Sequence, residues 1–218
     1  MEKKLKLDFH IHSLYSPDGN MKPYSILDSS ISKELNVIAV TDHNSIKGGI
    51  ETRNLAEKMG LDITVIVGQE IKTESGEIIV LNIEEEIEKD MALEETLIYA
   101  KKGFIITPHP FDKFRKGIGE ELDKISKNID AIEVFNSRTL FLGHNKLAET
   151  YAKTNNIPGV AGSDSHFVEE IGSSYFMINS KNKISSILKT IKEEEISIYG
   201  RQTGFRPHLK TSLIPLFK

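Results

Sequence analysis

Five short segments of the sequence place histidine or acidic side chains directly after hydrophobic runs. They are His10-Ile11-His12, Thr41-Asp42-His43, Gly68-Gln69-Glu70, Pro108-His109-Pro110 and Asp164-Ser165-His166. Imidazole and carboxylate groups are the ligands that borderline divalent metals take when no thiolate is present, and the chain has no cysteine. One such segment is a weak signal, but five together predict a hydrolase site that binds more than one metal ion.

Two of these segments share a spacing that suits metal binding. Side chains two residues apart on a strand point to the same side. His10 and His12 can therefore bind one ion from a single strand end, and Asp164 and His166 repeat that spacing later in the chain.

The other candidate ligands come one to a segment. Asp42 and His43 are adjacent and diverge, so we expect His43 to bind metal and Asp42 to orient an imidazole from behind. Glu70 has two carboxylate oxygens, which can bridge two cations about 3.5–4 Å apart. His109 lies between two prolines and is expected to bind the second of these ions. Asp18, in a turn sequence, is a weaker candidate.

Short β-branched runs alternate with helical patterns along the whole chain, which is typical of an α/β fold. The predicted strands are Leu5–Phe9, Asn36–Val40, Ile63–Val67, Phe104–Thr107, Ala131–Phe135, Gly159–Ala161 and Tyr175–Ile178. The predicted helices are Pro23–Leu35, Ile46–Met59, Met91–Lys102, Leu140–Asn155 and Lys183–Glu194. The near-continuous apolar character of the strands favours parallel pairing under helices on both faces.

The distribution of the candidate ligands favours a barrel over an open sheet. They follow so many different strands that they converge only at the carboxyl-terminal mouth of a closed barrel, whereas an open sheet gathers its site at one switch point. We therefore predict one domain, a distorted seven-stranded barrel over residues 1–199. A tail over 200–218 follows, basic through Arg201, Arg206, Lys210 and Lys218, and is expected to pack on the barrel.

Composition narrows the class of partner. A net charge of −4 argues against broad attraction to nucleic acid or to a membrane, but a small anionic substrate remains compatible because bound metals would reverse the local charge. No apolar stretch approaches the roughly 20 residues that span a bilayer, and the start of the chain lacks a signal-peptide pattern. We expect a cytoplasmic protein, and the sequence does not indicate its oligomeric state.

The ordered set of motifs resembles that of the PHP (polymerase and histidinol phosphatase) family. The match runs from Asp8 to His166. The resemblance implies a distorted seven-stranded (β/α)7 barrel that binds two or three divalent metal ions (Mn, Fe or Zn) and hydrolyses phosphate esters. The turn that contains Asp18 is similar to that of the subset of small metal-dependent phosphoesterases, some of which act on nucleotides.

Carried over residue by residue, the resemblance implies three metal positions. The first would take His10, His12, Glu70 and Asp164; the second would share Glu70 and take His109; the third would take His43, His166 and Asp18. Many members of the family offer one more histidine to the second ion, from the segment after the bridging glutamate. Residues 73–82 contain none, so we expect weaker binding there, helped by Glu133 or Asn136.

The same residues suggest a mechanism without a covalent intermediate. Water between two ions would lose a proton near neutral pH and attack phosphorus, with Glu70 holding the metals. The phosphate is expected to contact one or more of Arg115, Arg138, Arg201 and Arg206, because the guanidinium fork suits phosphate; Asn136 is a further candidate. His166, His43 or Asp42 would protonate the leaving group, and the sequence does not rank them.

We therefore predict a metal-dependent phosphoric ester hydrolase acting on a small phosphorylated metabolite or nucleotide. One alternative is a histidinol-phosphate phosphatase, although such enzymes tend to be longer and richer in histidine. Another is an exonuclease-type or polymerase-accessory domain, in which nucleic acid enters only as an oligonucleotide substrate. The acidic charge and the absence of interleaved basic and aromatic residues argue against that role.

Overall fold

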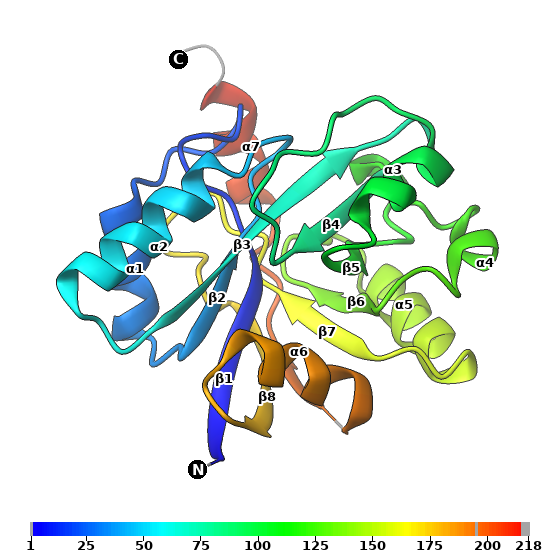
Figure 1. Cartoon of the computed structure of the whole chain (residues 1–218). Helices are drawn as coiled ribbons and strands as arrows, with labels where there is room; N and C mark the ends of the chain where they lie inside the picture. The colour runs from blue at the N-terminus through cyan, green and yellow to red at the C-terminus, as the bar shows by residue number, and fades with distance from the viewer. Residues whose placement is uncertain (1, 195, 215–218) are drawn as a thin grey trace.

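The structure, a computed structural model, describes residues 2–194 and 196–214. Within these residues, nine strands form one strongly curved sheet that nearly closes into a barrel (Figure 1). The strands are β1 (Lys3–Ile11), β2 (Val37–Val40), β3 (Thr64–Lys72), β4 (Glu77–Leu81), β5 (Phe104–Thr107), β6 (Ala131–Asn136), β7 (Gly159–Gly162), β8 (Ser174–Ser180) and β9 (Ser197–Gly200).

Strands β1 to β7 follow one another around the sheet in chain order, and β8 and β9 extend it beyond β1. The gap between β7 and β1 is bridged just above the two strands, where Ile11 pairs with Ser165 and the His12 amide donates to the Ser165 carbonyl at 2.9 Å. The predicted barrel class is confirmed. The strand count is not, because β4 and β9 were not predicted.

The expectation of an all-parallel sheet was wrong in part. β4 runs antiparallel to both β3 and β5, and β8 runs antiparallel to β1 and β9. The turn between β3 and β4 is only 73–76, far shorter than the dozen or more residues of a parallel crossover. A run of apolar residues indicates that both faces of a strand are buried, but it does not indicate whether the strand runs parallel or antiparallel to its neighbours. β4 is buried on both faces and antiparallel.

The helices cover the outside of the sheet. They are α1 (Pro23–Ser32), α2 (Lys47–Met59), α3 (Leu93–Ala100), α4 (Leu122–Ile125), α5 (Leu142–Thr154), α6 (Ile184–Glu193) and α7 (Phe205–Leu213), with a 3-10 turn η1 (Lys113–Arg115). The five predicted helices correspond to α1, α2, α3, α5 and α6. Local signals explain some boundaries: α1 starts at Pro23, and α2 ends where Gly60 adopts φ 63°, a left-handed cap that suits glycine.

Side chains from most of the strands fill the lower part of the barrel. Leu5, Leu7 and Phe9 of β1 pack in one apolar cluster with Ile187 and Ile191 of α6, and α6 lies across the end of the barrel near the N-terminus (Figure 1). Since that end is closed by apolar contacts, polar side chains gather at the opposite end, where β1 to β3 finish.

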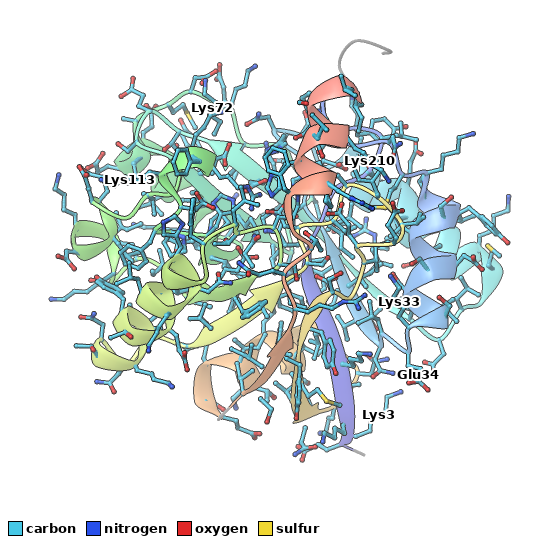
Figure 2. The ribbon with its side chains drawn as sticks, turned by 180° about the vertical axis from the view of Figure 1, so that it is seen from behind. Lys3, Lys33, Glu34, Lys72, Lys113 and Lys210 are labelled. Atoms are coloured by element: carbon cyan, nitrogen blue, oxygen red, sulfur yellow. The ribbon has the colours of Figure 1, made fainter. Side chains whose placement is uncertain are left out.

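The predicted tail, residues 200–218, begins at the last residue of β9 and contains α7. In the view from behind, α7 with Lys210 lies at the upper end of the molecule, opposite Lys3 of β1 (Figure 2). Residues 215–218, with the predicted basic residue Lys218, lie outside the described residues. None of the described helices is both long and apolar enough to cross a membrane.

Candidate metal centre

Glu70 of β3 lies at the centre of a buried cluster of histidines. Its Oε2 is 3.3 Å from the Nε2 atoms of His10 and His12 and 3.1 Å from His43 Nδ1. Its Oε1 is 3.2 Å from His109 Nε2. The two oxygens therefore face different histidines, which is the arrangement expected of a carboxylate that bridges two ions.

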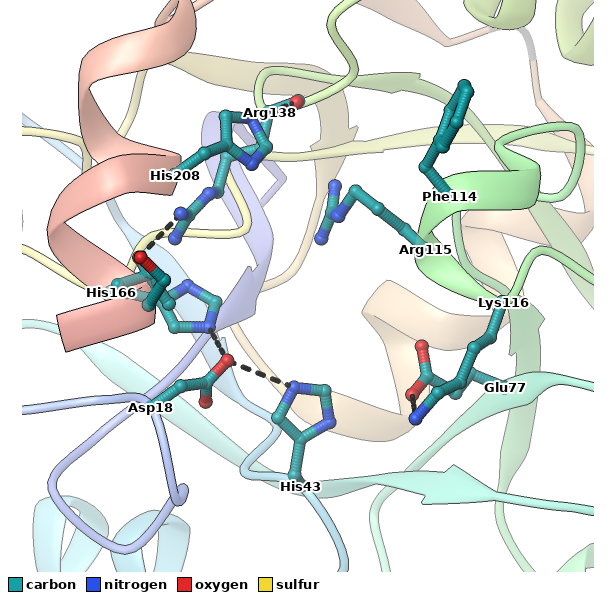
Figure 3. Close-up of a pocket in the computed structure, with 11 residues that line it drawn as sticks. Asp18, His43, Glu77, Phe114, Arg115, Lys116, Arg138, His166 and His208 are labelled. Atoms are coloured by element: carbon teal, nitrogen blue, oxygen red, sulfur yellow. Dashed lines mark hydrogen bonds and ion pairs between the residues drawn. The ribbon is translucent and has the colours of Figure 1, made fainter. Parts of the chain in front are cut away.

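Two further carboxylates complete the cluster. Asp164 Oδ1 lies 3.3 Å from His12 Nε2 and 3.7 Å from His10 Nε2. Asp18 Oδ2 lies 3.1 Å from His166 Nε2 and 3.7 Å from His43 Nε2, so that Asp18 joins the two imidazoles (Figure 3). The structure thus brings all eight predicted ligands together at one end of the barrel.

The donor set fits divalent metal ions. Among the residues that the structure describes, three groups have ligand atoms that all lie within 4.8 Å of one another: His12, His43 and His166; His10, His12 and Glu70; and Glu70, Glu77 and His109. Several buried atoms in the cluster have no hydrogen-bond partner among the described residues: His10 Nε2, His12 Nε2, Asp18 Oδ1, Glu70 Oε2 and Asp164 Oδ1. Each such atom costs about 1–3 kcal/mol unless something binds it, and buried carboxylate oxygens and imidazole nitrogens that converge without hydrogen bonds suit a bound cation.

The backbone is adapted to the cluster. His109 and Asp164 have φ of 27° and 56°, values that non-glycine residues rarely adopt and that concentrate at functional sites. Gly162 leaves no room for a side chain, because a Cβ there would lie 2.3 Å from the Cβ of His10 and 2.4 Å from Glu133 Oε1. The end of β7 therefore needs glycine for His10 and Glu133 to approach each other.

The charges in the cluster are balanced between acids and imidazoles. Burial favours neutral carboxyl groups, but His10 and His43 outweigh it and hold the pKa of Glu70 well below its usual range. Arg115 and His10 do the same for the pKa of Asp164. Burial, together with His166 and His43, lowers the pKa of His12 to about 4, so this imidazole is neutral and ready to bind a metal.

Metal binding to the metal-free protein is expected to release protons. Burial acts to lower the pKa of His10, but the charges of Asp164, Glu70 and Glu133 outweigh it and raise that pKa well above the usual value. His10 is then protonated at neutral pH, and a metal must displace about one proton from it. Affinity should therefore fall as the pH falls. Calorimetric titrations in buffers with different ionisation enthalpies measure the release, and an enthalpy that is the same in every buffer would contradict it.

Two buried carboxylates, Glu133 and Asp42, orient histidines of the cluster through hydrogen bonds on the side away from Glu70. Glu133 accepts a hydrogen bond from His10 Nδ1 at 2.9 Å and from the His109 amide at 2.8 Å, so it orients ligands and does not face the second ion. Asp42 accepts from Ser13 and from Ser16 Oγ, and Ser16 Oγ lies 2.9 Å from His12 Nδ1. Asp42 is fully buried among these donors, which fits the expected orienting role and not proton transfer to a leaving group.

Comparison with known proteins identifies the family to which a chain with this arrangement of ligands belongs. The chain is 38% identical over 145 residues to the uncharacterized protein MJ1587 of Methanocaldococcus jannaschii, covering 61% of this chain and 82% of that protein. It is 33% identical over 186 residues to the uncharacterized protein MJ0417 of the same organism, covering 82% and 72%. A sequence profile of the family described as PHP-associated matches residues 143–196.

A solved structure with the same fold is a two-domain protein from Bacteroides vulgatus that contains a predicted PHP-like metal-dependent phosphoesterase. The TM-score is 0.74 at 20% identity, over 92% of this chain and 66% of that one. The chain belongs to the PHP family. The family that the motifs suggested is thereby confirmed.

Beside the cluster of this PHP chain, a cavity of about 330 Å³ opens at the barrel mouth. Its lining includes two of the predicted arginines, Arg115 and Arg138, which approach from different sides (Figure 3). Arg115 pairs with Asp164. Arg201 lines a different cavity with Lys6, Lys33 and Tyr199, and Arg206 is not among the residues that line the mouth.

Asn136 was a candidate for contact with phosphate, but its side chain is used to hold neighbouring residues. Its Nδ2 donates to Glu133 Oε2 at 2.9 Å and to Asp164 Oδ2 at 2.8 Å. Its Oδ1 accepts from Arg115 Nη1 at 3.0 Å and from the Arg138 amide at 2.9 Å. An asparagine side chain forms about four hydrogen bonds, so Asn136 holds Asp164, the side chain of Arg115 and the backbone of Arg138 in place and has no capacity left for substrate.

Two parts of the PHP site were not predicted. Glu77, the first residue of β4, lines the cavity and joins Glu70 and His109 in one of the three ligand groups. His208, Thr211 and Ser212 of α7 also line the cavity; His208 Nε2 lies 2.7 Å from the Arg138 carbonyl, and Arg138 Nη2 donates to Thr211 Oγ1 at 2.6 Å. A sequence signal for α7 existed, since Phe205, Leu209 and Leu213 are spaced by four residues as on one helix face.

Proposed function

We propose that this chain is a metal-dependent phosphoesterase that releases phosphate from a small phosphorylated metabolite or nucleotide. The observation that carries the proposal is the cavity where Arg115 and Arg138 lie beside the cluster around Glu70. Anion-binding groups and metal ligands that share one opening suit a phosphate ester. The anion-binding groups would bind the negative charge of the phosphate, and the metal ions would activate the ester for hydrolysis. The likeness to a predicted PHP-like metal-dependent phosphoesterase supports the same reaction class.

Different residues of the site have different roles in the proposed reaction. The cluster around Glu70 would hold divalent ions, which would lower the pKa of water and stabilise negative charge on phosphate oxygens. Arg115 and Arg138 bind the phosphate and orient it toward Glu70. His43 and His166 line the cavity on either side of Asp18 (Figure 3), so whichever of the two imidazoles does not hold a metal ion is placed to deliver a proton to the leaving oxygen. Asp42 is fully buried and does not line the cavity.

The rim of the cavity favours substrates with a planar ring. Phe114 lines the cavity and is 82% exposed, and its ring lies 6.1 Å from that of Phe141. Exposed aromatic rings at a phosphate site suit a nucleobase, whose stacking contributes about 1–3 kcal/mol. We therefore expect nucleotides to be hydrolysed faster than phosphate esters without a ring.

A phosphate-release screen with Mn²⁺, Zn²⁺ and Fe²⁺ tests the proposal. It covers phosphomonoesters with and without a ring, histidinol phosphate, nucleoside bisphosphates and short oligonucleotides, with the Glu70→Gln variant as control. Metal-dependent release that this variant lacks supports the proposal. Absence of turnover with every substrate and metal, or turnover of oligonucleotides alone, would overturn it.

The Arg138→Gln substitution is expected to raise KM about ten-fold or more, because the variant loses a charged bond to the phosphate worth about 1.5–3 kcal/mol. Arg138 is 2% exposed, and its Nη1 has no hydrogen-bond partner among the described residues although it faces Glu170 at 3.7 Å. Arg201→Gln is the matched control, because Arg201 lines the other cavity. Steady-state kinetics decide: equal KM changes in the two variants would contradict a specific role for Arg138.

A further inference from the structure

Glu77 faces the metal cluster because β4 runs antiparallel to β3. Glu70 pairs with Ile79 and Lys72 pairs with Glu77 in the register of these strands. Side chains two apart on a strand share a face, so Glu77 and Glu70 both point to the interior. The turn before Glu77 is fixed by Thr73, which bonds to the Gly76 carbonyl at 2.8 Å, and the Glu77 amide donates to the Lys116 carbonyl at 3.1 Å.

The surroundings of Glu77 leave its charge poorly compensated. The residue is 6% exposed. Its Oε2 lies 4.0 Å from His109 Nε2, and its Oε1 lies 3.7 Å from Lys116 Nζ, both longer than a hydrogen bond. Glu70 places a second buried carboxylate on the same face. Two buried carboxylates beside an imidazole are unfavourable unless a cation binds between them.

His109 links the two carboxylates into one binding site. Its Nε2 lies 3.2 Å from Glu70 Oε1, and ligand atoms of all three residues fall within 4.8 Å of one another. His10, His12 and His43 face the other oxygen of Glu70. The group around Glu77 is therefore distinct from the two histidine-rich groups: it shares Glu70 with one of them and no residue with the other.

We infer that Glu77 is a ligand of this second metal position and makes it selective for an oxygen-preferring divalent ion, with Mn²⁺ as the expected occupant. The inference rests on the metal-dependent function proposed for the same site. The position offers two carboxylates and one imidazole, whereas the other two groups offer two or three imidazoles. Carboxylates and water suit Mg²⁺ and Mn²⁺, and imidazole suits Zn²⁺ and Fe²⁺. The carboxylate thus stands where the sequence lacks a histidine.

Titration of the metal-free full chain with Mn²⁺, followed by electron paramagnetic resonance and calorimetry, tests this inference without measuring turnover. Saturating the chain first with Zn²⁺ at the histidine-rich positions should leave one Mn²⁺ site. In Glu77→Gln we expect this site to weaken about ten-fold or more. Glu74→Gln is the matched control, because Glu74 is an exposed carboxylate in the same turn, and it should bind Mn²⁺ as the unchanged chain does.

Lys116→Gln provides an independent test if Glu77→Gln does not fold, as judged by circular dichroism. Lys116 is a half-exposed cation near Glu77, and its removal should strengthen Mn²⁺ binding about two- to five-fold. Unchanged Mn²⁺ binding in a folded Glu77→Gln, unchanged or weaker binding in Lys116→Gln, or displacement of all Mn²⁺ by Zn²⁺ would overturn the inference. A chain that binds Mn²⁺ through Glu77 but hydrolyses no phosphate ester would keep the inference and remove the proposed function.

Discussion

Replacing Glu70 with glutamine is expected to lower metal-dependent phosphate release by about 1,000-fold or more. The loss of a residue that only orients a metal ligand already lowers metal affinity or activity about 10–100-fold, and Glu70 is itself expected to bind metal. Glu70 Oε2 faces three histidines and Oε1 faces His109. Glutamine retains one acceptor oxygen, and its amide hydrogens would point at imidazole nitrogens that must offer lone pairs to a metal. Glu70 belongs to two of the three ligand groups found among the described residues, so its substitution disturbs two metal positions at once.

The measurement pairs turnover with metal content. Elemental analysis after gel filtration should find fewer ions per chain in Glu70→Gln than in the unchanged protein, and a phosphate-release assay should find the loss in kcat. Glu74→Gln serves again as the control because it removes the same charge from the solvent-exposed turn that follows β3. If Glu70→Gln kept its metals and its turnover, the bridging role would have to be abandoned.

The sequence was sufficient to predict the histidine cluster because of a general property of parallel strands. The carboxyl ends of β1, β2 and β3 meet at one end of a barrel whatever its exact shape. His10, His12, His43 and Glu70 therefore come together without any knowledge of distances. The same reasoning placed Asp164 and His166, which follow β7.

Glu77 was not predicted because the search for ligands considered only the carboxyl ends of strands, whereas an antiparallel strand brings its amino end to the barrel mouth. β4 runs opposite to β3, so its first residue, not its last, lies at the barrel mouth. The apolar run that follows, Ile78-Ile79-Val80-Leu81, was a strand signal, but its direction depends on pairing partners distant in sequence. Residues 73–82, which contain no histidine, thus contribute a carboxylate to the ligand group of Glu70 and His109.

The tail was expected to pack on the barrel, and its arginines were candidates for contact with phosphate. Charge alone, however, does not say which face of a segment turns inward. β9 pairs with β8, and α7 then lies over the mouth with His208 and Thr211 toward the cavity. The side chains that reach the site are thus polar and nearly neutral, and one of them holds Arg138.

Replacing Glu133 with glutamine is expected to have the second largest effect, although Glu133 is not itself placed as a ligand. Its Oε1 bonds to His10 Nδ1, and its Oε2 accepts from the His109 amide and from Asn136 Nδ2. These bonds fix the ring of His10, which faces Glu70 Oε2, and the backbone of His109, whose ring faces Glu70 Oε1. Metal affinity should fall about 10–100-fold, as it does when the partner of a metal-binding histidine is removed.

The same substitution should destabilise the metal-free protein. The glutamine amide can accept at only one of the two oxygen positions, so its NH₂ group must face either the ring nitrogen of His10 or the two donors at Oε2. Leaving a buried donor unpaired costs about 1–3 kcal/mol. Urea unfolding without metal measures this loss, and calorimetric titration of the folded variant measures the affinity. A loss of stability with full metal affinity would make Glu133 a scaffold residue only, whereas a loss of affinity larger than the stability change explains would show that it orients His10 and His109 for the metal.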